Sequence, residues 1–307
     1  MIFKFDDSIQ IISGKAVKDT ADLILHISGQ NHHISCDADL WQWLELKFMK
    51  SYEYLSKWDL QSIRSNRSLC DITAEKRKYL STVVVGYGDG MFTPPEAMEL
   101  VRKPSLVIVE NEANDWAVVR KWIDLLKKDR QYGNINTIVC QRKDSGYLRP
   151  YNAGSSGQIV NSIIQRQKEY HKGTGYKVTV LLDSDKTGPE DALSNEKEKI
   201  RQAMVDAGIE GHILYKREME NYFSESVYRE AKMIQTDSVP PYSDEDWDFL
   251  DIEKAPFTKY QKKDLPTLVE YLDKSSLLKR VGAGRRDYLG EMMNEIQIII
   301  MKLARLS

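Results

Sequence analysis

Two short stretches of the chain are apolar almost throughout, without regular polar alternation. Residues 106–109 read Leu-Val-Ile-Val, and residues 178–182 read Val-Thr-Val-Leu-Leu. Runs of this kind predict strands buried on both faces, as in a parallel sheet covered by helices. Each run ends in carboxylates, because Glu110 follows the first and both Asp183 and Asp185 follow the second. These residues are therefore expected at the carboxyl edge of a sheet, where open α/β sheets bind their ligands.

The middle of the chain alternates predicted strands with predicted helices. Strands are expected at 106–109, 135–140, 177–182 and 212–215, and helices at about 115–130, 158–170 and 189–207. Pro189 suits the first turn of the last helix, and Gly208 follows its expected end. This alternation predicts a parallel sheet with right-handed crossovers. Its carboxyl edge would collect the residues that follow each strand: Glu110, the polar loop 142–157, Asp183 with Asp185, and the segment 216–220.

The first hundred residues show a weaker pattern. Short apolar runs at 2–6, 9–13 and 21–28 are broken by Asp, Ser and Gly, which suggests a few antiparallel strands. Apolar and aromatic residues then recur at three- and four-residue steps over 41–58, which predicts an amphipathic helix capped by Asp39.

Three further signals follow in the same region. Residues 82–85 read Thr-Val-Val-Val and predict a strand, and the glycine-rich segment 86–90 predicts a turn. Residues 93–96, Thr-Pro-Pro-Glu, predict a helix start with a capping box. We therefore expect an α+β region over residues 1–103.

The residues after 225 predict a helical extension, 226–307. A loop at 236–247 contains two prolines and an acidic run and marks a boundary. Residues 264–280 and 286–305 then follow helical steps. The stretch Lys279-Arg-Val-Gly-Ala-Gly-Arg-Arg286 is the most basic short segment of the chain. It predicts either a contact with a phosphate backbone or an ordinary turn with solvated charges.

Composition places the chain among ordinary soluble proteins. Its 307 residues are 41% hydrophobic and 29% charged, and the net charge of -2 gives no global attraction to nucleic acid. No apolar run approaches the ~20 residues that span a bilayer, and the amino terminus lacks the features of a signal peptide. Cys36, Cys70 and Cys140 are too few and too dispersed for a disulfide framework. A cytoplasmic location is expected.

The carboxylates suggest a metal site. If the two apolar strands are neighbours, Glu110, Asp183 and Asp185 converge and repel one another unless a cation lies between them. Hard oxygen ligands of this kind suit Mg²⁺. Lys216 would neutralise charge on a phosphate, or is a plain surface charge, and Glu220 is either a further ligand or a carboxylate favoured at a helix start.

These residues resemble the TOPRIM domain of topoisomerases, bacterial primases and nucleases of the overcoming-lysogenization-defect (OLD) family. The resemblance covers about residues 105–225 and rests on Val107-Ile-Val-Glu110, Asp183-Ser-Asp185 and Lys216-Arg-Glu-Met-Glu-Asn-Tyr222. The third piece is most similar to the nuclease branch, which includes short antiviral relatives. The chain departs from the family at Asn111 and Asn114, which stand where a Gly and an acid are usual.

The resemblance implies an α/β fold in which residues 104–225 form a TOPRIM-like parallel sheet flanked by helices. It also implies a Mg²⁺- or Mn²⁺-dependent endonuclease of an antiviral defence system. The implied catalytic residues are Glu110, Asp183, Asp185 and Lys216. The implied metal ligands are Glu110, Asp183, Asp185, Glu220 and Asp115, which lies one step beyond the usual position.

Alternatives remain open at this point. DNA is the expected substrate, with RNA such as tRNA as an alternative, and Asn111 and Asn114 leave open a non-catalytic nucleic-acid-binding subunit. Primase and topoisomerase functions are disfavoured, because no zinc module and no cleavage-domain tyrosine pattern is recognisable.

A protein partner is also expected. The chain lacks a P-loop, since its nearest piece, Ser13-Gly-Lys-Ala16, lacks the upstream Gly and the hydroxyl. Nuclease-branch TOPRIM domains commonly act with an ATPase, so an ATPase partner is expected. Residues 1–103 and the helix 286–305 are the expected docking surfaces. A homo-oligomer is also compatible with the sequence.

Overall fold

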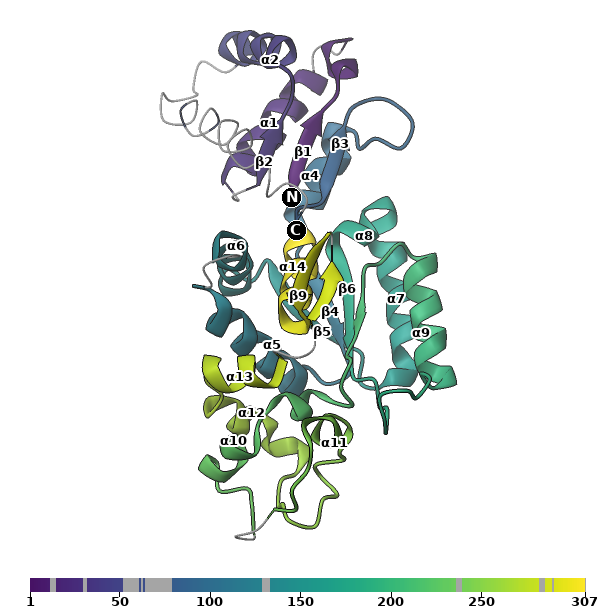
Figure 1. The fold of residues 1–307 in the computed structure, drawn as a ribbon. Helices are drawn as coiled ribbons and strands as arrows, with labels where there is room; N and C mark the ends of the chain where they lie inside the picture. The colour runs from purple at the N-terminus through teal and green to yellow at the C-terminus, as the bar shows by residue number, and fades with distance from the viewer. Residues whose placement is uncertain are drawn as a thin grey trace. The chain divides into compact units, whose positions relative to one another are not determined.

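The computed structural model describes residues 1–11, 15–29, 32–51, 61, 63, 79–128, 133–235, 239–281, 285–288 and 290–306. The chain divides into two compact units, one of Met1–Pro104 with Ala304–Ser307 and one of Ser105–Leu303 (Figure 1). Each unit contains a small parallel sheet flanked by helices, so the protein is α/β. Among these described residues, no helix is long and apolar enough to cross a membrane.

The first unit is built on a three-stranded sheet. Its strand order is β2 (His33–Ser35), β1 (Ile2–Phe5) and β3 (Thr82–Val85), and both pairings are parallel. The other elements are η1 (Asp7–Ile11), α1 (Lys15–Gly29), α2 (Ala38–Ser51) and α4 (Pro94–Arg102). The strand at 82–85 is thus confirmed.

The expectation of antiparallel strands in this region is wrong. The first apolar run forms β1, the described residues 9–11 of the second belong to η1, and the third, 21–28, lies inside α1. The buried positions of α1 explain the difference, because they recur at three- and four-residue steps: Val17, Thr20, Ala21, Leu23, Ile24, Ile27 and Ser28. A helix then connects β1 to β2, which allows these two strands to run parallel.

Two helix starts of the first unit test the capping predictions. The Asp37 side chain accepts a hydrogen bond from Leu40 N at 2.8 Å, so Asp37 caps α2 and the assignment to Asp39 is wrong. The capping box before α4 is confirmed, since Thr93 N donates to Glu96 Oε2 at 2.7 Å. The end of the helix predicted over 41–58 lies outside the described residues.

The second unit contains a four-stranded parallel sheet. Its order is β5 (Leu148–Asn152), β4 (Ser105–Val109), β6 (Val178–Leu182) and β7 (His212–Ile213). Every residue of β4 and β6 is buried, and the two strands pair with Leu106 beside Val178 and Ile108 beside Val180. This confirms that the two apolar runs are buried neighbouring strands.

Helices cover both faces of this sheet (Figure 1). Helices α7 (Ser156–Tyr170) and α9 (Asn195–Asp206) pack on one face, where Ile159, Ile163, Ile200 and Met204 join a core with residues of β4 and β6. Helix α5 (Glu112–Leu126) lies on the other side, with α6 (Gly133–Asp144) against it. A short turn of helix, η3 (His171–Gly173) and α8 (Thr174–Lys177), leads into β6.

The strand expected at 135–140 is wrong, because these residues belong to α6. Its buried residues Ile135, Asn136, Val139 and Cys140 recur at the helical step, and Asn136 Nδ2 donates to Leu126 O at 2.6 Å. The fourth strand is instead β5, inside the predicted loop 142–157. It lies at the sheet edge and contains Pro150, which edge strands tolerate.

Two helices of the second unit begin elsewhere than expected. Asn111 caps α5 by accepting from Asn114 N at 3.2 Å, so this helix begins at Glu112. Ser194 caps α9 by accepting from Lys197 N at 3.2 Å, so that helix begins at Asn195 and Pro189 lies in the preceding turn. In both cases a side-chain cap fixes the start more strongly than the residue expected there.

The remainder of the second unit is not purely helical. It contains η4 (Met219–Tyr222), α10 (Glu225–Glu230), α11 (Asp244–Phe249), η5 (Lys262–Asp264), α12 (Leu265–Glu270), α13 (Lys274–Val281), β8 (Arg285–Tyr288), β9 (Glu291–Asn294) and α14 (Glu295–Arg305). The helix predicted at 264–280 is interrupted at Asp273, whose side chain accepts from Ser276 N at 2.8 Å. The first half of the helix predicted at 286–305 is wrong, since β8 and β9 form an antiparallel hairpin.

Candidate functional site

Carboxylates gather at the carboxyl edge of the second unit's sheet. Glu110 follows β4, and Asp185 follows the neighbouring β6. Both bind Lys197 of α9, whose Nζ lies 2.6 Å from Glu110 Oε1 and 3.0 Å from Asp185 Oδ2. The Lys197 side chain is only 1% exposed. The structure therefore brings two of the predicted acids together, with a buried lysine between them.

A second group of acids surrounds Lys262, which comes from η5. Lys262 Nζ lies 3.5 Å from Asp183 Oδ2, and Asp183 Oδ1 accepts from Met219 N at 3.1 Å. Burial lowers the pKa of Lys262, but the negative charges of nearby carboxylates raise it by more. These carboxylates belong to Asp183, Glu220, Glu218 and Asp115. This lysine is therefore the cation shared by most of the remaining predicted ligands.

Backbone and side-chain hydrogen bonds hold the other two predicted ligands. Glu220, in η4, is 1% exposed, and its Oε1 accepts from the Tyr260 hydroxyl at 2.9 Å. Asp115, in the first turn of α5, is 6% exposed, and its Oδ2 accepts from Asn111 N at 2.8 Å. Asp115 thus lies among the site's acids although it is one step from the family position.

Burial dominates the protonation of these acids. It raises the pKa of Asp115 to about 6 and the pKa of Glu220 to about 7. Burial, together with the charge of Glu220, raises the pKa of Asp183 well above its usual range, against the opposing charge of Lys262. The group around Lys262 therefore holds more carboxylates than one lysine neutralises, which favours a bound proton or an additional cation.

One atom of this group has unused ligating capacity. Glu220 Oε2 is buried and has no hydrogen-bond partner in the described part of the chain. A buried carboxylate oxygen without a partner is costly, and a hard cation such as Mg²⁺ or Mn²⁺ would satisfy it. Across those same residues, however, no three His, Cys, Asp or Glu side chains are arranged to hold one ion. The donor atoms are of the type that binds a divalent ion, but the described arrangement does not bring three of them to one point.

Lys216 is not placed beside these carboxylates. Its Nζ pairs with Asp248, donates to Arg280 O at 2.9 Å, and lies 5.1 Å from the centroid of the Tyr222 ring. The side chain is 7% exposed. The cation that faces the acids is therefore Lys262, and Lys216 belongs to a separate buried cluster.

Two site residues carried no usable signal in the sequence. Lys197 stands in a charged helical segment and looks no different from the exposed Lys199. Lys262 lies far along the chain from Asp183 and next to the exposed Lys263. Only the packing of the chain distinguishes these buried or paired lysines from their neighbours.

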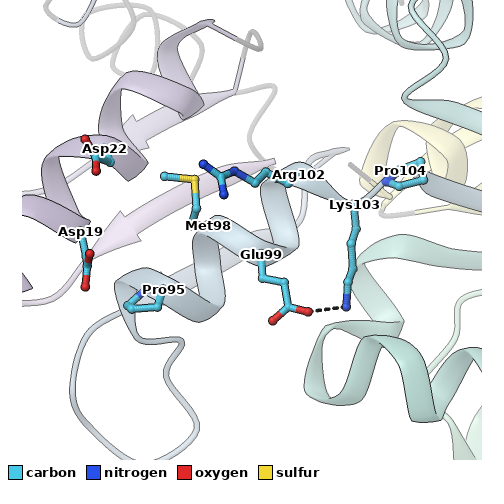
Figure 2. Close-up of a pocket in the computed structure, with 8 residues that line it drawn as sticks. All are labelled: Asp19, Asp22, Pro95, Met98, Glu99, Arg102, Lys103 and Pro104. Carbon is cyan, nitrogen blue, oxygen red and sulfur yellow. Dashed lines mark ion pairs between the residues drawn. The ribbon is translucent and has the colours of Figure 1, made fainter.

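The first unit has a pocket of its own, of about 490 Å³, lined by residues of α1 and by residues at and after α4 (Figure 2). Its lining carries both signs of charge, with Asp19 and Asp22 on α1 and Arg102 on α4. Glu99 and Lys103 form an ion pair at 2.6 Å. This pocket shares no residue with the carboxylate site.

No protein-family model, curated protein or solved structure matches the chain. By its fold the chain is an α/β protein with two small parallel sheets flanked by helices. Acids gather at the carboxyl edge of the second sheet.

Proposed function

We propose that the chain is a TOPRIM-like, divalent-metal-dependent nuclease that hydrolyses phosphodiester bonds, with DNA as its substrate. The observation that carries this proposal is the convergence of acids from neighbouring buried strands. Glu110 follows β4 and Asp183 and Asp185 follow β6, as the resemblance requires. Glu220, the acid of the third motif, lies close enough to Asp183 to raise its pKa.

Asp183, Glu220 and Asp115 are the residues that would hold the ion, and they would have to move closer together to do so, since no three such side chains of the described residues are arranged to hold one. A bound Mg²⁺ or Mn²⁺ supplies activation of water and stabilisation of the leaving oxygen. At neutral pH the Glu220 carboxyl carries a proton part of the time, since burial raises its pKa to about 7, and it would have to give up that proton to act as a ligand. Lys262 lies beside these ligands and is partly exposed, so it is placed to neutralise charge on a phosphate.

Lys197 has a different part in this proposal. It orients Glu110 and Asp185 through the two short ion pairs and is itself almost fully buried. A buried amine between two carboxylates keeps them from repelling each other before an ion arrives. It therefore preserves the shape of the sheet edge in the metal-free protein.

The same lysines favour a second candidate function. Lys197 and Lys262 already neutralise part of the charge that a metal ion would neutralise. A domain stabilised in this way would bind nucleic acid without cleaving it. The two candidates differ in whether a divalent ion displaces a lysine.

A cleavage assay separates them. Purified protein is incubated with plasmid, single-stranded DNA and total RNA, each with Mg²⁺, Mn²⁺ or chelator. Metal-dependent cleavage is expected and should fall by at least about a hundredfold in Asp183→Asn, since losing a metal-binding carboxylate removes transition-state stabilisation. Asp191→Asn is the matched control, because Asp191 is exposed and its carboxylate accepts hydrogen bonds from Thr187 and Gly188 of its own turn.

The outcomes of that assay are distinct. Cleavage of RNA alone would show that the substrate is RNA and not DNA. Binding of nucleic acid without cleavage under any metal condition would favour the non-catalytic function. Equal cleavage by wild type and Asp183→Asn, with contamination excluded, would remove the site assignment.

We also propose that the nuclease acts with an ATPase partner, as part of an antiviral defence system. The chain has no P-loop of its own, and its net charge of -2 gives little general affinity for a polyanion. The helix nominated for docking is not available as an apolar surface, since Ile296, Ile299, Ile300 and Leu303 of α14 are buried. A partner would therefore contact other surfaces than this helix.

A further inference from the structure

A pocket of about 360 Å³ lies in the second unit, apart from the carboxylate site. Residues at the start of α10, at the start of α11 and in the last turn of α13 line it. It shares no residue with the groups around Lys197 and Lys262. Pockets of this size take small organic ligands.

Three cationic side chains line this pocket: Arg229, Lys279 and Arg280. Arg280 is 9% exposed, and its guanidinium donates to Asn221 O at 3.2 Å and to Asp244 Oδ1 at 2.8 Å. Lys279 is exposed and has no hydrogen-bond or ion-pair partner in the described part of the chain. The pocket thus combines an immobile arginine with a lysine that is available to a ligand.

Two acids also line the pocket, and each is paired with a cation. Glu225 Oε1 accepts from Arg229 Nε at 2.6 Å, and Asp244 accepts from Arg280. The Asp244 side chain is 93% exposed, so water weakens its pair with Arg280. Arg280 also pairs with Asp248, which does not line the pocket, so Lys279 is the lining cation without a paired acid among the described residues.

Hydroxyl groups supply further hydrogen bonds to an anion. Ser224 Oγ and Ser226 Oγ lie 2.8 Å apart, and both line the pocket beside Arg229. Serine hydroxyls, arginine and lysine are the side chains that bind phosphate oxygens most often. This part of the lining therefore suits a phosphate group.

The pocket also contains a flat apolar surface, which is the ring of Tyr242. This ring is partly exposed and lines the pocket. Its other contacts fix it, because it packs edge-to-face on Trp247 with centroids 6.3 Å apart and tilted on Phe257 at 5.7 Å. A fixed aromatic ring next to phosphate-binding groups is the combination that binds nucleotides, by stacking on the base.

We propose that this pocket binds the phosphate of a nucleotide, with its base against Tyr242. The phosphate contacts Lys279, Arg280 and the serine hydroxyls. The ligand is a free nucleotide or one nucleotide of a single strand, since both present the same chemistry. This proposal does not rest on the nuclease function, because the site lies apart from the carboxylates and needs no metal.

The test is calorimetric titration in the presence of chelator, so that failure of the metal site cannot affect it. The probes are 5′-AMP, inorganic phosphate and a short single-stranded oligodeoxynucleotide. The variants are Lys279→Glu and Ser226→Glu, both at exposed positions, and Tyr242→Ala. Lys199→Glu is the matched control, since Lys199 is an exposed lysine of α9 that does not line the pocket.

Wild type should bind 5′-AMP at one site. Lys279→Glu and Ser226→Glu should each weaken binding at least about tenfold, whereas Lys199→Glu should change it less than about twofold. Tyr242→Ala should weaken 5′-AMP and leave inorganic phosphate unchanged, because only the nucleotide has a base to stack. Thermal unfolding of each variant verifies that it is folded.

The arms of the titration identify the source of the nucleotide. Equal affinity for 5′-AMP and the oligonucleotide indicates a free nucleotide. Tighter binding of the oligonucleotide, lost in Lys279→Glu, indicates a strand. Absence of binding to all three probes by wild type would overturn the proposal, as would equal losses in Lys279→Glu and Lys199→Glu.

Discussion

Asp183 and Glu110 lie at the same sheet edge in opposite electrostatic surroundings. Asp183 is buried among other acids, and its pKa lies well above the usual range. Glu110 is paired at 2.6 Å with Lys197, whose one other carboxylate partner among the described residues is Asp185. Removing the negative charge should therefore stabilise the folded protein at Asp183 and destabilise it at Glu110.

The two substitutions should consequently have opposite effects on the metal-free protein. Asp183→Asn should raise the free energy of unfolding, because the amide keeps an acceptor for Met219 N without a buried charge. Glu110→Ala should lower it by about 2 kcal/mol, because Lys197 loses its closest charged partner. Urea unfolding at pH 7 with chelator measures both. Changes in the same direction would contradict the charge distribution described for this edge.

The raised pKa values of Asp115 and Glu220 predict a pH dependence of stability. A carboxyl whose pKa is higher in the folded protein binds its proton more tightly there than in the unfolded chain, so stability falls as pH rises between the two values. For Asp115 that interval runs from 3.8 to about 6, and for Glu220 from 4.5 to about 7. The loss attributable to Asp115 is roughly 3 kcal/mol, at about 1.4 kcal/mol per pKa unit.

Comparison with neutral variants isolates this effect from other groups that titrate. The free energy of unfolding of wild type, relative to Asp115→Asn or Glu220→Gln, should fall between about pH 4 and pH 7 in chelator. Denaturant unfolding at several pH values measures the difference. A difference that stays constant across this range would show that these carboxyls ionise normally.

Among the elements, α14 fixes the segment that carries Glu220. Its first residue, Glu295, is buried and accepts from Tyr215 N at 2.7 Å. The same carboxylate bonds His212 Nε2 at 2.8 Å and the Tyr222 hydroxyl. Tyr222 belongs to η4 together with Glu220. The start of the last helix thus positions η4 relative to β7.

Glu295→Ala should destabilise the protein by roughly 3 kcal/mol, because two buried donors and one partly buried donor lose their acceptor. Thermal unfolding followed by circular dichroism provides the measurement, with Glu230→Ala as a control at an exposed position of α10. Similar melting temperatures for the two variants would mean that α14 does not fix this segment.

The sequence predicts those elements correctly whose residues are nearly all apolar, because such a run indicates burial on every side. Strands β4 and β6 are buried on both faces, so all their residues except Ser105 and Thr179 are apolar. The segment 135–140 is short enough to fit either period, and its packing as α6 depends on α5 through Asn136. Strand β5 was missed because only Leu148 of its residues is buried. An edge strand does not need an apolar run.

The site was predictable for its acids and not for its lysines. Glu110 and Asp185 follow neighbouring strands, which sequence order and strand pairing are sufficient to suggest. Lys197 and Lys262 reach the same edge from elements whose positions depend on the complete fold. Lysine is usually exposed, so a buried lysine has no signal of its own in a single sequence.

At the scale of the whole molecule, the chain is expected to work with a partner. Large apolar side chains are exposed in both units, for example Leu46 and Tyr87 in the first and Met292 in the second. Co-expression with the genomic neighbours should yield a complex with an ATPase whose presence changes cleavage. Pull-down and mass measurement detect the complex. Full-rate cleavage by the monodisperse chain, with no neighbour bound, would contradict this expectation.

Binding of a divalent ion at the carboxyl edge of β4 and β6 underlies every step proposed for cleavage, and calorimetric titration with Mn²⁺ tests it directly. Wild type should bind Mn²⁺, and Asp183→Asn and Glu220→Gln should each weaken binding at least about tenfold, because each removes one anionic ligand. Asp191→Asn should bind as wild type does. No Mn²⁺ binding by the folded wild-type protein, or unchanged affinity in Asp183→Asn, would contradict a metal site at this edge.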